Sequence, residues 1–377
     1  MTSFGYNVLG FGSSANAGTL MTFGAEDVFE EVASSYLTID RLSATTAIAG
    51  YKDASNNGRC VILTVDGTSI SAGDPVTFTT SATKDIDVVA LSASKALVVY
   101  TGADGFARVV SISGTTPSYG TEFSFTNSEI WAVAGSKLTA STVMVGYTDK
   151  TNSERFDAVV LSCPNTTVSA GTIVNLDAGA TSGDVGCVAL TSTLAMCVYT
   201  DEGNNNYGTA TAMTISGTTI TKGTPVVFDS DGGAAQIAAA PLTATTAVVT
   251  YARGGVKARV LTVADATTVS AGSALSYLTG TPSGNKIARV SDTTAVTISN
   301  NANYYGTAYI LTISGTNVTG ASAATSYNDE GQSGPNGSVP DGDIIMLSDT
   351  VGVIAFQDYH GASSAARYGT SIAFELG

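Results

Sequence analysis

Charged residues are scarce in this chain of 377 residues, and positive charges are the scarcest. Lys and Arg contribute 16 residues and Asp and Glu contribute 31, so only 12% of the chain is charged and the net charge is −15. A surface with this sign of charge repels a phosphate backbone. We therefore expect no nucleic-acid partner.

Histidine and cysteine are also rare. The single histidine is His360, and the four cysteines are Cys60, Cys163, Cys187 and Cys197. The cysteines have no CxxC spacing and are too few for a disulfide-rich scaffold, so we expect buried, reduced thiols. One disulfide stays open as the alternative, because Cys187 and Cys197 could face each other across a hairpin.

Signals for export and for a membrane span are missing. The first basic residue is Arg41, so the N-terminus has neither the basic flank of a secretory signal nor the Arg content of a transit peptide. Residues 232–252 carry no charge, but Pro241 and several threonines interrupt them. The sequence predicts no membrane span.

Glycine is abundant, with 41 residues, and a repeat of about fifty residues runs through the chain. The phrase TTAIAGY ends at Tyr51, and related phrases end at positions 100, 147, 199, 251, 299 and 356. A short apolar run precedes each phrase, such as DVVAL at 87–91. Each pair of runs predicts a hairpin, and there are seven pairs.

Two further strands follow each hairpin. A polar loop leads to an alternating strand such as 208–215, and a turn such as SGTT leads to a Gly-led strand such as 222–228. We name the four strands of a unit A, B, C and D in chain order. The inner strands are apolar on both faces, as expected where units pack face to face, and the abundant Thr and Val suit a pleated sheet.

The two ends of the chain predict a closed ring. The seventh unit stops after its third strand, TSIAFEL at 370–376, whereas AGTLMTF at 17–23 is a fourth-strand sequence with no unit before it. Pairing of these ends completes one unit and leaves no free sheet edge. The sequence therefore predicts an all-β, seven-bladed β-propeller over residues 14–377, with four antiparallel strands per blade. A short helix is expected at 25–32, where two valines share a face.

Candidate binding residues lie in the loops after the second strands. In a four-stranded blade the B–C and D–A loops emerge on the same face, and no two of the seven B–C loops are alike. Variable loops on a regular scaffold usually carry binding, although each single residue can also be read as a solvated turn residue. The candidates are Asn205, Tyr207, Asn303, Tyr304, Tyr305, Asp358, Tyr359 and His360.

Neither a metal nor another cofactor is expected. Residues 53–58 imitate the first half of an EF-hand loop, but Thr64 stands where a bidentate acid is needed. The long D–A loop at 326–343 has acidic residues without EF-hand spacing. An acidic surface is the simpler interpretation, and calcium in these loops remains the alternative.

Catalytic signatures are missing as well. No G-x-S-x-G elbow surrounds a serine, and adjacent acids such as Asp201 and Glu202 are expected to be exposed, with nothing to raise a pKa. The only tryptophan, Trp131, lies in a first-strand run and is expected in the core. The sequence predicts a protein that is not an enzyme. A polysaccharide-cleaving enzyme is the remote alternative, with Asp358, Tyr359 and His360 as its first suspected site.

The opening FGYNVLGFGSSANAGTLMTF at 4–23 and units such as TTAVVTY, TATAMTISGTTIT and GTPVVF resemble structural proteins of marine tailed phages, particularly those of cyanobacteria. The resemblance covers nearly the whole chain. It implies a virion component of the tail, its fibres or the capsid decoration, made in the host cytoplasm and without catalytic residues. The implied partners are other virion proteins of tail or capsid, a host-surface glycan or protein, and further copies in a homo-oligomeric assembly.

The segment 1–13 has no place in the seven-blade count. Its alternating apolar residues predict an assembly anchor that adds a strand or plug to a neighbouring virion protein. Packing of the segment across its own disc is the alternative. The leading functional hypothesis is thus a virion protein that displays a propeller for assembly contacts or host attachment, and the second is a glycan-binding propeller lectin. The anchor residues are Phe4, Tyr6, Val8, Leu9 and Phe11.

Overall fold

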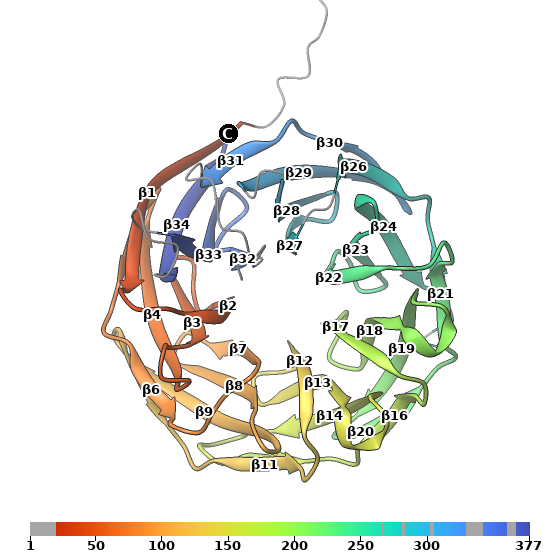
Figure 1. Cartoon of the computed structure of the whole chain (residues 1–377), viewed down its shortest axis with the longest axis horizontal. Helices are drawn as coiled ribbons and strands as arrows, with labels where there is room; N and C mark the ends of the chain where they lie inside the picture. The colour runs from red at the N-terminus through yellow and green to blue at the C-terminus, as the bar shows by residue number, and fades with distance from the viewer. Residues whose placement is uncertain (1–19, 266, 281–282, 302–304, 329–341, 360–366) are drawn as a thin grey trace, which may run out of the picture.

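Seven β-sheets stand around a central axis and form a closed ring (Figure 1). This computed structural model describes residues 20–377 except 266, 281–282, 302–304, 329–341 and 360–366. The predicted seven-bladed β-propeller is confirmed. In the described part of the chain there is no α-helix and therefore none that could cross a membrane.

Each blade runs outward from the axis in the order A, B, C, D. Blade 1 contains β2 (Ser35–Arg41), β3 (Thr46–Lys52), β4 (Gly58–Asp66), β5 (Ser69–Ala72) and β6 (Val76–Thr79). Blade 2 contains β7 (Ile86–Ser92), β8 (Lys95–Thr101), β9 (Gly105–Ser113), β10 (Thr116–Tyr119) and β11 (Phe123–Thr126). Blade 3 contains β12 (Ile130–Lys137), β13 (Thr142–Asp149), β14 (Arg155–Ser162), β15 (Ser169–Ala170) and β16 (Val174–Asp177), with the 3-10 turn η1 (Lys150–Asn152).

Blades 4 to 7 repeat this order. Blade 4 contains β17 (Thr181–Ala189), β18 (Leu194–Asp201), β19 (Tyr207–Ser216), β20 (Thr219–Lys222) and β21 (Val226–Asp229), with η2 (Glu202–Asn204). Blade 5 contains β22 (Ala235–Pro241), β23 (Thr246–Ala252), β24 (Gly255–Val263), β25 (Val269–Ala271) and β26 (Leu275–Thr279). Blade 6 contains β27 (Ser283–Ser291), β28 (Thr294–Asn300), β29 (Gly306–Ser314), β30 (Asn317–Ala321) and β31 (Thr325–Asn328). Blade 7 contains β32 (Gly342–Met346), β33 (Val351–Tyr359), β34 (Arg367–Leu376) and β1 (Met21–Glu30).

The N-terminus closes the ring, as the sequence predicts, but the closing strand is Met21–Glu30, which shares only residues 21–23 with the predicted strand at 17–23. β1 pairs antiparallel with β34, and Phe23 lies opposite Phe374. In Figure 1 the red β1 runs along the outside of the blue blade. The helix expected at 25–32 is wrong, because residues 21–30 continue as one strand that the C-terminal blade holds by hydrogen bonds.

The fourth strand of blades 1 to 6 is broken into two pieces. In blade 4, β20 and β21 both pair with β19, on either side of a short gap. The gap begins at a position of the repeat that holds glycine in blades 1 to 5, here Gly223, and Ser322 in blade 6. A Cβ on Gly223 would lie 2.2 Å from the carbonyl oxygen of Thr267 in blade 5. The Gly-led pattern therefore marks a backbone contact between neighbouring blades.

Aromatic side chains fill the space between blades. The repeat tyrosine of each B strand is fully buried in blades 1 to 5, and an aromatic residue of an adjacent strand packs against it. Phe228 of blade 4 contacts Tyr251 of blade 5 with ring centroids 5.4 Å apart. At the closure, Phe29 of β1 contacts Tyr51 of blade 1 in the same way, at 5.3 Å. The N-terminal strand thus joins two blades.

A buried acid adds a polar link at that point. The hydroxyl of Tyr51 donates to Glu30 of β1 at 2.8 Å, and Arg59 forms an ion pair with the same carboxylate. Arg259, Tyr251 and Asp229 repeat this arrangement between blades 4 and 5. Burial and the neighbouring acid raise the pKa of both tyrosine hydroxyls, for Tyr251 to about 12.

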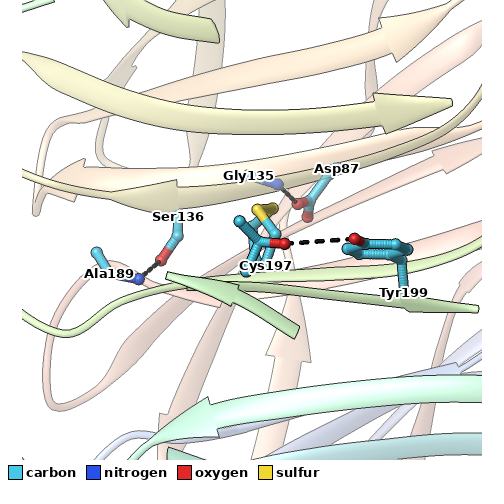
Figure 2. Close-up of a disulfide and its surroundings, with 8 residues drawn as sticks. Asp87, Gly135, Ser136, Ala189, Cys197 and Tyr199 are labelled. Carbon is cyan, nitrogen blue, oxygen red and sulfur yellow. Dashed lines mark hydrogen bonds between the residues drawn. A yellow bond between two sulfur atoms is a disulfide. The ribbon is translucent and has the colours of Figure 1, made fainter. Parts of the chain in front are cut away.

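The cysteines differ from the expectation in one respect. Cys187 of β17 and Cys197 of β18 form a disulfide across a directly paired position, so reduced thiols are wrong for these two residues (Figure 2). Cys60 and Cys163 are free and buried, as expected. The pair meets because the register of the hairpin places the two residues opposite each other, with Cα atoms 4.2 Å apart. Gly146 of blade 3 leaves room for the sulfurs, since a Cβ there would lie 2.5 Å from the Cys187 sulfur.

Candidate binding site

A central channel of about 1100 Å³ runs along the axis of the ring. Its wall is made of the seven A strands, β2, β7, β12, β17, β22, β27 and β32 (Figure 1). Because every A strand runs in the same sense, the channel has two different ends. We call the end where the A strands begin, and where the B–C and D–A loops emerge, the upper mouth.

The exposed edges of the inner strands are partly covered by side chains of the preceding blade. An edge strand presents unpaired N–H groups, which need partners when they are removed from water. The carboxylate of Asp343 accepts from the Ile39 amide at 3.1 Å, and Asp87 accepts from the Gly135 amide at 2.6 Å. Figure 2 shows the second of these bonds beside the disulfide. The carboxylates therefore link the inner strands of consecutive blades.

Burial raises the pKa of these channel acids. Desolvation raises the pKa of Asp87 to about 7 and that of Asp40, which accepts from the Ala90 amide, to about 6. The pKa of Asp343 is raised for the same reason. In each case backbone donors and a lysine of the channel wall oppose the shift. Near neutral pH Asp87 is thus only partly ionised.

The opposite arc of the channel wall is small and apolar. The position that holds Asp87 in blade 2 holds Gly186 in blade 4 and Ala238 in blade 5, according to the pairing of each A strand with its B strand. Lys286 occupies it in blade 6. The channel is therefore acidic on one side and small and apolar on the other, although the scaffold repeats.

Two exposed aromatic side chains lie at the upper mouth. Trp131, near the start of β12, is 40% exposed, so its expected place in the core is wrong. The register of β12 shifts between Ile130 and Val133, and this irregularity turns the tryptophan outward. Tyr36 of β2 is 38% exposed and has a φ of 55°, which is rare for a bulky residue. Both residues line the channel.

Lysines accompany both rings. The ammonium of Lys52 lies 4.8 Å from the ring centroid of Tyr36, and that of Lys150 lies 4.9 Å from the ring centroid of Trp131. Glu129 forms ion pairs with Lys150 and with Lys84, and these two partners lower its pKa. The upper mouth above blades 1 to 3 thus combines exposed aromatic rings with three of the sixteen cations of the chain.

The loop residues predicted to bind are spread over three blades. Asn205 is exposed in the B–C loop of blade 4, and Tyr207 begins β19 beside it. Tyr305 is half-buried in blade 6, where its amide donates to Asn301. Asp358 is buried at 1% exposure and accepts from Asn328 at 2.6 Å, so it serves the contact between blades 6 and 7.

The other predicted loop and anchor positions cannot be placed. Asn303, Tyr304, His360 and the anchor residues Phe4, Tyr6, Val8, Leu9 and Phe11 lie outside the described residues, as does the side chain of Tyr359. The residues at the upper mouth were not predicted as a site. The sequence signal available for them is the polar and aromatic residues that interrupt the apolar runs of the A strands.

In the loop at 53–58, which resembles the first half of an EF-hand loop, Asp53 accepts hydrogen bonds from groups of the same loop. Asp53 accepts from the Ser55 and Asn57 amides at 2.8 and 2.9 Å and from the Asn57 side chain at 3.0 Å. These contacts stabilise the turn. Among the described residues no group of three or more His, Cys, Asp or Glu side chains is arranged to hold a metal.

One expectation about the acids is wrong. Asp201, expected to be exposed, is only 9% exposed, and burial together with the charge of Asp177 raises its pKa. Its neighbour Glu202 is exposed as expected. The acid that interacts with Asp201 is therefore Asp177 of the neighbouring blade 3 and not Glu202, its neighbour in sequence.

Fold and channel together define a seven-bladed propeller with an asymmetric axial channel, and solved structures share the fold. The chain is similar to the BP39L lectin of Burkholderia pseudomallei, with 9% identity, a TM-score of 0.62 and coverage of 90% of this chain and 98% of the lectin. It is also similar to the β-propeller domain of Cps50 (Swd1) from Myceliophteria thermophila, with 8% identity, a TM-score of 0.55 and coverage of 93% and 99%. A protein of unknown function from Dyadobacter fermentans gives 10% identity, a TM-score of 0.53 and coverage of 95% and 99%. At these identities the likeness concerns the fold alone.

No family model matches the sequence, and no curated protein matches it.

Proposed function

We propose that this chain is a non-enzymatic virion protein that attaches to a host-surface ligand through the upper mouth of its propeller. The observation that carries the attachment role is the exposure of Trp131 and Tyr36 at the end of a channel large enough for a small ligand. Aromatic residues are enriched where proteins bind partners, and here they stand on a rigid wall of strands. The virion context is supported by the sequence resemblance to phage structural proteins.

The attachment role is tested with the full chain and whole host cells. Trp131→Ala is expected to lower the amount of protein that cells retain, whereas Trp131→Phe, which keeps an aromatic ring, is expected to keep most of it. The thermal midpoint reports whether each variant is folded. Equal retention of the wild type and a folded Trp131→Ala variant would contradict the role of the upper mouth.

The virion context has its own test. Particles purified from an infected culture are expected to contain the chain in a fixed ratio to the major capsid protein. A chain without residues 1–13 is expected to fold with an unchanged thermal midpoint and to be missing from particles, since that segment is proposed as the assembly anchor. Purified particles that lack the full-length chain would remove the virion context.

A glycan-binding lectin that acts without a virion is the second candidate. The specific observation in its favour is the pair of exposed aromatic rings, because a sugar can stack on such a ring. The similarity in fold to the BP39L lectin agrees with it. Binding of cells by a chain that never enters particles would favour the lectin over the virion protein.

A further inference from the structure

We infer that the upper mouth above blades 1 to 3 binds a glycan that carries anionic groups, such as sulfate or carboxylate. This inference rests on the proposed attachment function and names the ligand class for the same site. The chain carries a net charge of −15, yet three of its sixteen cations gather beside the two exposed aromatic rings.

The lysines differ in how they are engaged. Lys84 and Lys150 share the carboxylate of Glu129, and Asp85 is held by the Val133 amide at 2.9 Å. For Lys52 no ion pair is found within the described ranges, and its ammonium lies over the ring of Tyr36. An ammonium held over an aromatic face keeps its charge and N–H donors available to an anion. Lys52 is thus the best placed of the three to receive one.

The rings supply the second half of the recognition. A pyranose ring presents a face of C–H groups, which packs on an aromatic side chain with its apolar surface, while its substituents point outward. At the upper mouth such substituents would meet the ammonium groups of Lys52, Lys84 and Lys150. Aromatic ring and cation together favour a sugar with a negative charge over a neutral one.

The acids of the channel wall repel an anionic ligand less than their number suggests. Burial raises the pKa of Asp87 to about 7, so this acid of the channel wall is only partly ionised near neutral pH, and the charge of Lys286 offsets that of Asp343. They also accept from backbone amides, which spreads their charge. An anion at the upper mouth therefore meets less repulsion than the net charge of the chain suggests.

The experiment compares two polymers with the same sugar backbone, dextran and dextran sulfate, titrated against the full chain. We expect dextran sulfate to bind about tenfold more tightly than dextran and its binding to weaken as salt increases, because charge pairs at a rim are screened. Lys52→Gln is expected to weaken binding of dextran sulfate severalfold. Lys222→Gln removes the same charge from an exposed position on the outer strand of blade 4 and is expected to change nothing.

Three results would overturn the inference. Equal binding of the two polymers, with Trp131→Ala weakening both, would leave the attachment function standing and exclude the preference for anions. Equal losses from Lys52→Gln and Lys222→Gln would show diffuse attraction and no site. Absence of binding to either polymer would reject the ligand class, while the cell-retention test decides separately on the attachment function.

Discussion

Replacement of the D-strand glycine by alanine tests the contact that joins consecutive blades. A Cβ on Gly171 of blade 3 would lie 2.1 Å from the carbonyl oxygen of Thr218 in blade 4, where real Cβ atoms do not approach. Its amide is fixed by a bond of 2.9 Å to the Val160 carbonyl, so the backbone cannot withdraw freely. Overfilling of a packed contact costs about 1–3 kcal/mol.

The chain contains a matched control for this change. Gly320 also lies in a D strand, that of blade 6, but an added Cβ there meets no atom within 4 Å. The position in blade 6 that is equivalent to Gly171 holds Ser322, whose amide donates to the Ile310 carbonyl at 2.8 Å, and a side chain fits there because blade 7 takes its fourth strand from the N-terminus and has no C–D turn to face it. Gly320→Ala is therefore expected to be neutral or to stabilise the fold by about 0.5 kcal/mol, because alanine restricts the unfolded chain.

Differential scanning calorimetry distinguishes the two variants. For a chain of this length, we expect Gly171→Ala to lower the thermal midpoint by about 2–4 °C, and Gly320→Ala to leave it unchanged or slightly raised. The same shift for both variants would refute the idea that the glycines are needed for contact between blades. A lower midpoint for Gly320→Ala alone would refute it as well.

Three further predictions concern the closure, the disulfide and the channel acids. A chain without residues 1–30 loses β1 and is expected to aggregate, as judged by size-exclusion chromatography, whereas one without residues 1–13 stays monodisperse. Cys187→Ala with Cys197→Ala is expected to lower the unfolding free energy by about 2–3 kcal/mol in denaturant titrations, and a reductant is expected to destabilise only the wild type. The pKa of Asp87 is about 7 in the folded state and ordinary in the unfolded state, so its contribution to stability is complete at low pH and is lost as pH rises through 7. Asp87→Asn is expected to remove about 1 kcal/mol of the change in unfolding free energy between pH 6 and pH 8. An unchanged pH dependence of the unfolding free energy would contradict this.

The ring could be predicted from the sequence because a repeat imposes the same local rule seven times. The hairpins ending near Tyr51 and its counterparts are pairs of short apolar runs separated by turn residues, which favour strands, and a fourth-strand sequence ahead of the first unit predicts closure. The helix expected at 25–32 failed for the opposite reason. Val28 and Val32 fit a helical face, but long-range pairing with β34 decides their conformation.

The disulfide and the upper mouth were harder to predict, since both depend on exact register. Cys187 and Cys197 form a disulfide because the register of the hairpin places them directly opposite each other, and a shift of one residue in either strand would separate them. Trp131 was expected in the core because it stands in an apolar run, and a bulge of β12 moves it to the surface. A shift of one residue reverses the face of a strand, and no composition rule reports such a shift.

The residues proposed to bind lie at positions where the seven blades have different side chains. Such positions are free to vary in a repeat protein because no contact repeated from blade to blade constrains them. Positions that contact the next blade are constrained by that contact: the glycine that faces a C–D turn recurs in blades 1 to 5, and blade 6, which faces no such turn, has Ser322 in its place. Positions on the channel wall are not constrained by a contact of this kind, and equivalent positions hold Asp87, Gly186 and Lys286 in different blades. A ligand on the axis would contact several blades at once, and together these blades form one asymmetric surface. Variation among equivalent inner positions is therefore the feature that a search for binding sites in such a ring should follow first.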